Sequence, residues 1–272
     1  MTFKRLQGLD LDGLVLYDID DESDRNPKER PFPFLPTMDP AQYLSRHLKD
    51  WHLPAIVYRA VGSYAEPQLR SWLSAQEPDR NLSVFVGASS RAKPVRTSLA
   101  RAQALRSEVK PDLLLGGVAI PERHTRHGDE HLRLLAKQGA GCSFFITQVV
   151  YDVNAAKNLV SDYRYECAAR GRDPVPIVFT FSVCGSMKTL EFLRWLGVEV
   201  PRWIQNDLQH ADDTLDVSFE QARATALELI GFCRRLGVPF GLNVESVSMR
   251  RTEIESSVRL AASLQGELRR SG

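Results

Sequence analysis

The feature that most constrains the fold is a regular alternation of two kinds of segment along the chain. Short apolar runs, rich in β-branched and aromatic residues, alternate with longer segments in which apolar residues recur at helical spacing. Apolar runs of this kind are typical of strands that are covered on both faces, as in parallel sheets. We predict seven strands, at Gly13–Ile19, Ala55–Val61, Leu82–Gly87, Asp112–Ala119, Ser143–Val150, Pro176–Val183 and Pro239–Glu245.

Segments with helical periodicity fill the gaps between these strands. The first begins with Asp39 followed by Pro40, a typical helix start, because Asp caps the free N–H groups and Pro fits the first helical position. The predicted helices are Asp39–Trp51, Glu66–Gln76, Thr97–Ser107, Gly128–Lys137, Asn154–Arg170, Met187–Leu196, Ser218–Leu236 and Thr252–Leu264.

This alternation predicts one α/β domain spanning residues 1–272. Strands joined by helices through short connections form right-handed βαβ units and a parallel sheet. The length suits a TIM-type (β/α)8 barrel, and no Gly-x-Gly-x-x-Gly follows any strand as a dinucleotide-binding sheet would require. Since only seven strands are evident, the first strand–helix unit is reduced or missing. Either Thr2–Leu6 forms a minimal first strand, or the barrel is incomplete or closed by a partner.

Charge and cysteine usage narrow the functional classes. The 35 basic and 34 acidic residues give a net charge of +1, which provides no electrostatic basis for binding nucleic acid or a membrane surface. We find neither an apolar signal segment in Met1–Asp10 nor a stretch long enough to span a bilayer. The four cysteines lack Cys-x-x-Cys spacing, so we expect no disulfides and a cytoplasmic location. We interpret Cys184 as a buried small side chain rather than a nucleophile.

Three histidines form the pattern His-x-x-His-x-x-x-His at His124, His127 and His131. At the start of one helix, His127 and His131 would share a face. No cysteine or carboxylate pattern completes a ligand set with them, so we expect no metal site. Their position instead favours polar groups at a helix start near a cofactor phosphate.

Polar side chains of a barrel enzyme gather where its strands end. Three stretches near such ends carry a recognisable pattern: Gly117–His124 with its Pro-Glu turn, Gly139–Asp152 with Gly-Ala-Gly and Ile-Thr-Gln, and Leu196–Trp203 with Val-Pro-Arg-Trp. Their order and spacing resemble the methylenetetrahydrofolate reductase family over about Gly13 to Ala262, most sharply from Val118 to Asp152.

The resemblance implies an α/β barrel that reduces 5,10-methylenetetrahydrofolate to 5-methyltetrahydrofolate, usually with a flavin (FAD) that NAD(P)H reduces. By motif match, Gln148 is the folate-contacting glutamine, whose amide offers both a donor and an acceptor to a pterin edge; the alternative is an amide that only caps a strand end. Tyr151 and Tyr17 are further substrate contacts that the resemblance implies. The cofactor contacts it implies are Asp18, Ala119, Glu122, Glu130 and Lys137.

Several positions depart from the family pattern. We find no counterpart of the family's first strand with its catalytic Glu in the sequence pattern, and the aspartate expected after Leu82–Gly87 reads as Ala88. The usual histidine before the Pro-Glu turn reads as Ile120, and Arg133 and Ala136 replace an amide and an arginine. Each change removes a polar or charged flavin contact, so we expect flavin binding to be weakened or lost.

Two functional hypotheses follow. In the first, NAD(P)H delivers hydride directly to the folate, which requires a general acid to open the five-membered ring. Glu245 is the candidate acid, because it ends the last strand in an apolar run that would raise its pKa; the alternative is a solvated carboxylate. In the second, the barrel binds a reduced folate without reductase activity, for one-carbon transfer in specialised metabolism or as a partner subunit. An incomplete barrel edge makes homo-oligomerisation a further hypothesis.

Overall fold

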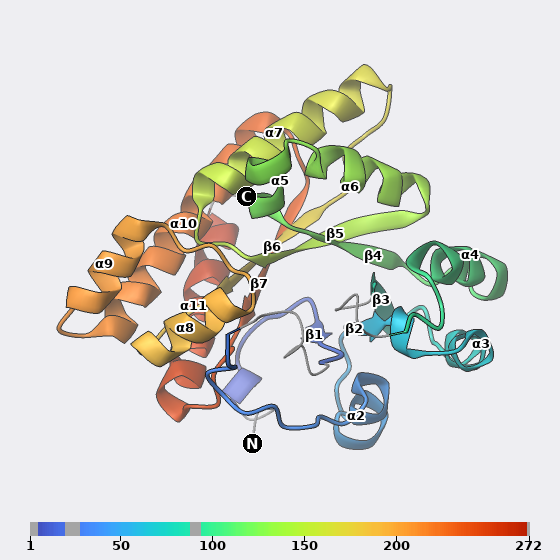
Figure 1. The fold of residues 1–272 in the computed structure, drawn as a ribbon, viewed down its shortest axis with the longest axis horizontal. Coiled ribbons are helices and arrows are strands. Elements are labelled where there is room, and N and C mark those ends of the chain that lie inside the picture. The colour runs from blue at the N-terminus through green and yellow to red at the C-terminus, as the bar shows by residue number, and fades with distance from the viewer. Residues whose placement is uncertain (1–4, 20–27, 88–93, 271–272) are drawn as a thin grey trace. The chain divides into compact units, whose positions relative to one another are not determined.

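The computed structural model of the chain describes residues 5–19, 28–87 and 94–270. Seven strands follow one another along these residues (Figure 1), and each overlaps one of the seven runs expected from the sequence. They are β1 (Leu14–Leu16), β2 (Ala55–Ala60), β3 (Asn81–Val86), β4 (Leu115–Ala119), β5 (Cys142–Val149), β6 (Ile177–Ser182) and β7 (Phe240–Glu245).

Helices connect successive strands. Those in the first part of the chain are α2 (Pro40–His47), the short 3-10 helix η2 (Val61–Ser63), α3 (Glu66–Ser74), α4 (Leu99–Val109), α5 (Pro121–His127) and α6 (Glu130–Gly139). Those in the second part are α7 (Val153–Ala169), α8 (Met187–Trp195), α9 (Arg202–His210), α10 (Thr214–Leu236) and α11 (Arg251–Arg270).

The strands form one sheet in the order β1-β2-β3-β4-β5-β6-β7, so sequence neighbours are also sheet neighbours. The pairs β1–β2, β2–β3, β3–β4 and β6–β7 are parallel, and the register of β6 on β7 runs from Ile177 opposite Phe240 to Ser182 opposite Glu245. Parallel strands in sequential order with helical crossovers define the TIM-type α/β barrel class, which confirms the predicted fold class.

The reduced start of the barrel is also confirmed for the described residues. β1 has only three residues, and β1 and β7 are the two ends of the strand order. Arg5 and Leu6 are helical, so they do not supply the minimal first strand that Thr2–Leu6 was considered for.

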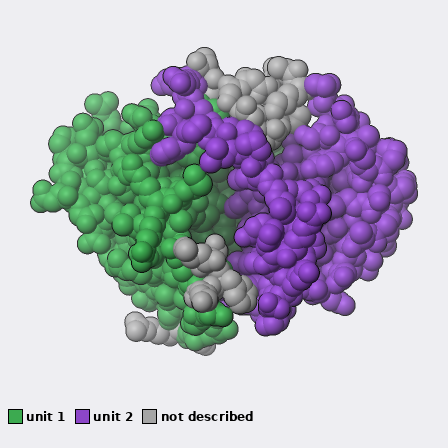
Figure 2. All heavy atoms as spheres, turned by 90° about the horizontal axis from the view of Figure 1, so that it is seen from below, with its two compact units in different colours: residues 1–10, 119–135, 146–272 green, residues 11–118, 136–145 purple. Residues whose placement is uncertain are grey.

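The chain divides into two compact units, coloured separately in Figure 2. Unit 1 contains residues 1–10, 119–135 and 146–272, and unit 2 contains residues 11–118 and 136–145. The boundary falls inside β4, α6 and β5, so each unit is built from segments that are separate in the sequence.

Unit 2 shows how local sequence shapes the strands. Gly116 in β4 has no Cβ, and a Cβ placed there would lie 2.4 Å from Cε2 of Phe144 in β5. That distance is far inside van der Waals contact, so the glycine makes room for the aromatic ring between the two strands. Gly116 therefore belongs to the packing of β4 on β5, and not to a phosphate loop.

Two predicted helices begin at a different residue in the structure, each for a local reason. The predicted helix Gly128–Lys137 begins later, because Gly128 adopts a left-handed conformation (φ 69°) that ends α5, and α6 starts at Glu130. His127 and His131 therefore lie on different helices and do not share a face. Helix α10 begins at Thr214 rather than at Ser218, because the Asp213 carboxylate accepts hydrogen bonds from the first backbone N–H groups.

Two further sequence interpretations concern burial. All four cysteines are free and buried, and Cys184 is completely shielded from solvent. Burial raises the pKa of the Cys184 thiol to about 12, so the group is a protonated packing element and not a nucleophile.

Among the helices of the described ranges, none has the length and apolar content needed to cross a membrane.

Candidate functional site

Gln148 lies next to the last residue of β5, at the end of the strand where barrel chemistry gathers. Its side chain is half-buried. The amide nitrogen donates to the Leu196 carbonyl at 3.4 Å, and the amide oxygen accepts from the Val149 N–H at 3.2 Å. Both contacts are longer than a typical N–H···O bond of about 2.9–3.0 Å, so a ligand can replace them at small cost.

Tyr151, three residues further on, lies in the core of unit 1. It is 5% exposed and packs in an apolar cluster with Val149, Leu190 and Leu193, while its hydroxyl donates to the Ser182 carbonyl at 3.3 Å. Burial raises the pKa of the phenol well above its usual range. This placement gives the ring a packing role in unit 1, and the substrate contact implied for Tyr151 remains a prediction.

The Pro-Glu turn follows β4 and becomes the first turn of α5, with Pro121 in the first helical position. Glu122 is 2% exposed, and its Oε2 atom has no hydrogen-bond partner among the described residues. Burial raises the pKa of Glu122 to about 7, and the nearby carboxylates of Glu199 and Asp152 act in the same direction. Burial therefore favours the protonated form of Glu122 more than that of an exposed glutamate.

Ala119, the last residue of β4, is completely buried. Neither its side chain nor its backbone is exposed to solvent in this structure, and the cofactor contact implied for Ala119 remains a prediction.

Glu130 opens α6 and is 0% exposed. Its Oε1 accepts from the backbone N–H of Ile120 at 3.2 Å, and its Oε2 pairs with Arg123 at 3.1 Å and lies 3.8 Å from Arg133. The buried charge is thus compensated inside unit 1, and the carboxylate fastens the start of α6 to the Pro-Glu turn.

Lys137 lies further along α6, in the part of that helix that belongs to unit 2. Its ammonium group donates to the Val118 carbonyl of β4. Like Glu130, Lys137 has a partner within its own unit, so the cofactor contacts implied for both remain predictions.

Glu245 is the last residue of β7 and is half-buried, opposite Ser182 of β6. Its backbone carbonyl accepts from the Ser257 hydroxyl at 3.4 Å. The position at a strand end agrees with the sequence argument, while its role as an acid remains a prediction.

The sequence pattern does not identify a second carboxylate, Glu253, which lies near the C-terminal end of β6. Glu253, in the first turn of α11, is 1% exposed, and its Oε1 accepts from the Gly185 N–H and the Thr189 hydroxyl, both at 2.9 Å. Its Oε2 has no partner among the described residues. An acid early in a helix usually faces solvent, so no sequence signal distinguished this one.

In unit 2, Tyr17 and Asp18 come directly after β1. The Tyr17 ring lies 4.6 Å from the ring of Tyr58 in β2, measured between centroids. The Asp18 carboxylate accepts from the Ala60 N–H at 2.9 Å and from the Tyr64 hydroxyl at 3.3 Å. Both residues therefore connect the ends of β1 and β2, and this anchoring limits how freely they can turn toward a ligand.

The Tyr64 hydroxyl also belongs to a charged cluster around Arg59, near the end of β2. Arg59 is 2% exposed and donates to Asp39 at 2.5 Å and to Tyr64 at 2.8 Å. Its guanidinium lies 4.7 Å from the ring centre of Tyr64 and 4.4 Å from that of Trp72. The buried cation is thus held by one carboxylate and two aromatic faces.

Comparison with known proteins adds to this geometry. The family model for methylenetetrahydrofolate reductase matches residues 92–239, more than half of the chain. The chain belongs to the methylenetetrahydrofolate reductase family. The match includes the Pro-Glu turn, the Ile-Thr-Gln strand end and the Val-Pro-Arg-Trp segment, which carried the resemblance in the sequence.

Among solved structures, an uncharacterized protein from Clostridium thermocellum that binds two copies of 5-methyl-5,6,7,8-tetrahydrofolic acid is 44% identical. The similarity covers 97% of this chain and 86% of that one, with a TM-score of 0.84. A psychrophilic family 10 endo-β-1,4-xylanase, 9% identical over 97% of this chain and 99% of its own, has a TM-score of 0.49 and says nothing about function. No curated protein matches the chain.

The family assignment leaves the flavin contacts open. Ala88, which replaces the expected aspartate, lies outside the described residues. The two charged residues matched to flavin contacts on α6, Glu130 and Lys137, both have partners within the chain.

Proposed function

We propose that this chain binds a reduced folate and, as a methylenetetrahydrofolate reductase-like enzyme, reduces 5,10-methylenetetrahydrofolate to 5-methyltetrahydrofolate with NAD(P)H. The observation that carries the proposal is the 44% identity to a protein that binds 5-methyltetrahydrofolate, the product of this reaction. The similarity extends over 97% of the chain, with a TM-score of 0.84.

Gln148 is the proposed folate contact. It is half-buried, lies at the end of β5, and gives up only long internal contacts when it turns its amide toward a ligand. A pterin presents adjacent donors and acceptors along one edge, and an amide can match one of each.

The reaction needs a hydride and a proton. The bond between the methylene carbon and N10 of the folate breaks, N10 takes the electron pair and a proton, and the hydride from NAD(P)H adds to the methylene carbon. Glu245 is the proposed proton donor, because it stands half-buried at the end of β7.

Flavin is not part of this proposal. The residues matched to flavin contacts do not offer a ready set of free polar groups: Glu130 is compensated by two arginines, Lys137 donates to Val118, and Ala119 is buried. This supports hydride transfer from NAD(P)H without an intermediate carrier.

The second candidate function is folate binding without reduction. It is favoured by the short β1, since the resemblance places a catalytic Glu on a first strand that has no counterpart before β1 in the part of the chain that the structure describes. A binding protein requires the Gln148 contact but not the proton from Glu245, so the two functions make different predictions for the same variants.

The test begins with purified protein, its visible spectrum, and its thermal unfolding with and without 5-methyltetrahydrofolate. A free ligand concentration of 100 times the dissociation constant stabilises the folded protein by about 2.7 kcal/mol, and a thermal melting curve can resolve this difference. We expect Gln148→Ala to lose most of this stabilisation, while Gln221→Ala, a change on the outer helix α10, keeps it. An undiminished stabilisation of Gln148→Ala would remove Gln148 from the site, and no stabilisation of the wild type would refute folate binding.

Oxidation of NADH and NADPH with 5,10-methylenetetrahydrofolate, with and without added FAD, then separates the two functions. We expect turnover without FAD in the wild type, and a loss of turnover with retained folate binding in Glu245→Gln. Folate binding without turnover under any condition would establish the binding function, and full turnover in Glu245→Gln would eliminate that residue as the acid.

A further inference from the structure

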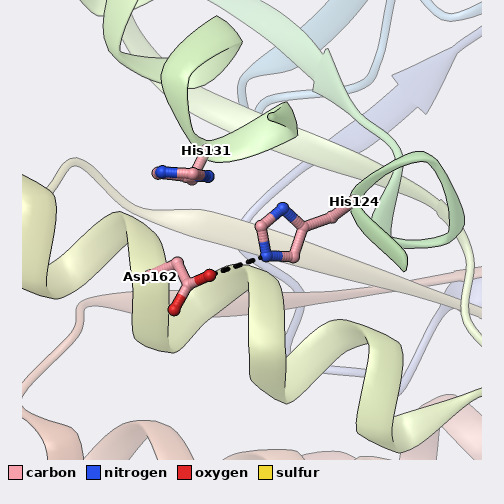
Figure 3. Close-up of side chains that lie close together, drawn as sticks. All are labelled: His124, His131 and Asp162. Carbon is pink, nitrogen blue, oxygen red and sulfur yellow. Dashed lines mark hydrogen bonds and ion pairs between the residues drawn. The ribbon is translucent and has the colours of Figure 1, made fainter. Parts of the chain in front are cut away.

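Three side chains from three helices of unit 1 meet at one place (Figure 3). His124 comes from α5, His131 from the start of α6 and Asp162 from α7. One possible ligand atom from each residue lies within 4.8 Å of the other two. Within residues 5–19, 28–87 and 94–270, this is the one group of three such residues that could hold a metal ion.

The two histidines are unusual in their hydrogen bonding. Nε2 of His124 lies 3.0 Å from Oδ2 of Asp162, but the Nδ1 atoms of both His124 and His131 are buried without a partner among the described residues. A buried polar atom without a partner costs free energy, and most such atoms in proteins are satisfied. Two of them beside one carboxylate indicate that a ligand completes the group.

We propose that His124, His131 and Asp162 bind one divalent transition-metal ion of the zinc class. One ring nitrogen of each histidine and one carboxylate oxygen are the ligands such an ion prefers. The carboxylate offsets one of its two positive charges. Three protein ligands leave one position of a tetrahedral ion open to water or a further ligand.

The geometry requires only a small adjustment. Ligand atoms bonded to zinc at about 2.0–2.1 Å lie roughly 3.4 Å apart in a tetrahedral site, so atoms that are at most 4.8 Å apart must draw together by no more than about 1.4 Å. Asp162 is 54% exposed and can move, whereas His124 is 6% exposed and held in place. The exposed carboxylate also gives the ion a path from solvent.

The sequence pattern did not predict this site. It placed His127 and His131 on one face of a single helix, but Gly128 ends α5 after His127, so the two histidines lie on different helices and His127 is exposed. The third ligand is Asp162, 31 residues beyond His131 and on another helix, so no local spacing reveals it.

The ion would fasten α5 and the start of α6 to α7. Two buried carboxylates lie close to the ligands in the sequence: Glu122 is two residues before His124, and Glu130 directly precedes His131. The proposed ion therefore has a positioning role for the Pro-Glu turn, and it does not depend on which folate reaction the chain performs.

The experiment uses full-length protein treated with a chelator and then titrated with Zn²⁺ in a calorimeter, with Co²⁺ as a visible probe of tetrahedral coordination. We expect one ion per chain. His131→Ala and Asp162→Asn should each weaken the affinity by about tenfold or more. His127→Ala, a neighbouring exposed histidine outside the group, should bind like the wild type.

Circular dichroism of each variant shows that it folds. If His131→Ala fails to fold, Asp162→Asn decides the question, because its side chain is exposed and its replacement keeps the shape. Wild-type protein that binds no stoichiometric ion, or Asp162→Asn that binds with unchanged affinity, overturns the proposal. Equal weakening by His127→Ala also overturns it, since binding would then be to scattered surface histidines.

Discussion

Replacing Asp39 by Asn tests the charged cluster of unit 2. Asp39 has two tasks: its Oδ1 caps α2 by accepting from Ala41 and Gln42, and its Oδ2 pairs with Arg59. The change to Asn keeps an oxygen for the cap and removes the charge opposite Arg59. The change to Ala removes both.

The expected loss of unfolding free energy follows from how deeply the two charged side chains are buried. Arg59 is 2% exposed and Asp39 is 26% exposed. Removing one partner of a fully buried ion pair costs about 3–5 kcal/mol, and the partial exposure of Asp39 reduces this to about 2–3 kcal/mol for Asp39→Asn. Loss of the cap adds about 1 kcal/mol, so Asp39→Ala should cost about 3–4 kcal/mol.

The assay is urea unfolding of the wild type and both variants at pH 7 and in acid. Burial alone would raise the pKa of Asp39, but Arg59 and the backbone N–H groups together hold it below 3.8. A lowered folded-state pKa adds stability that is present above pH 3.8 and is lost as the pH falls through the folded value. Wild type and Asp39→Asn should therefore converge in acid. A cost for Asp39→Asn below about 0.5 kcal/mol at pH 7, or one that does not fall in acid, would refute the reasoning.

Two further predictions concern glycines of unit 2, and chemical unfolding measures both. Gly116→Ala should destabilise the protein by about 1–3 kcal/mol because its Cβ meets the Phe144 ring at 2.4 Å, whereas Gly117→Ala, with a nearest contact of 3.2 Å, should cost less; equal costs would contradict this. Gly141→Ala should cost about 1–3 kcal/mol because Gly141 has φ +94°, and its Cβ would also lie 2.4 Å from Nη2 of Arg106; a neutral effect would contradict the strain argument.

The sequence predicted features that local physics determines. Asp39 caps the first turn of α2 and Pro40 occupies its first helical position, and the mostly apolar run before Gln148 forms a buried strand. The same local patterns placed seven strands and the strand ends where polar side chains gather. The family resemblance then identified a folate as the ligand expected at Gln148.

Features that depend on distant residues were not predictable in this way. The short helix α5 begins at Pro121 and ends before Gly128. The sequence pattern favours a strand and a turn in this stretch, because seven residues are too few to show helical periodicity. Tyr151 follows the strand end in sequence but turns into the core, and Asp162 meets His124 only after α7 packs beside α5. Such pairings are fixed by tertiary packing, which sequence spacing does not record.

The division of the chain into two interleaved units has a consequence for its genetics. Unit 1 is assembled from three stretches of sequence and unit 2 from two, and the boundary cuts through β4, α6 and β5. No single truncation of the gene therefore encodes either unit alone. An insertion within residues 119–135 would interrupt unit 1, whereas an insertion only a few residues later, within residues 136–145, would interrupt unit 2.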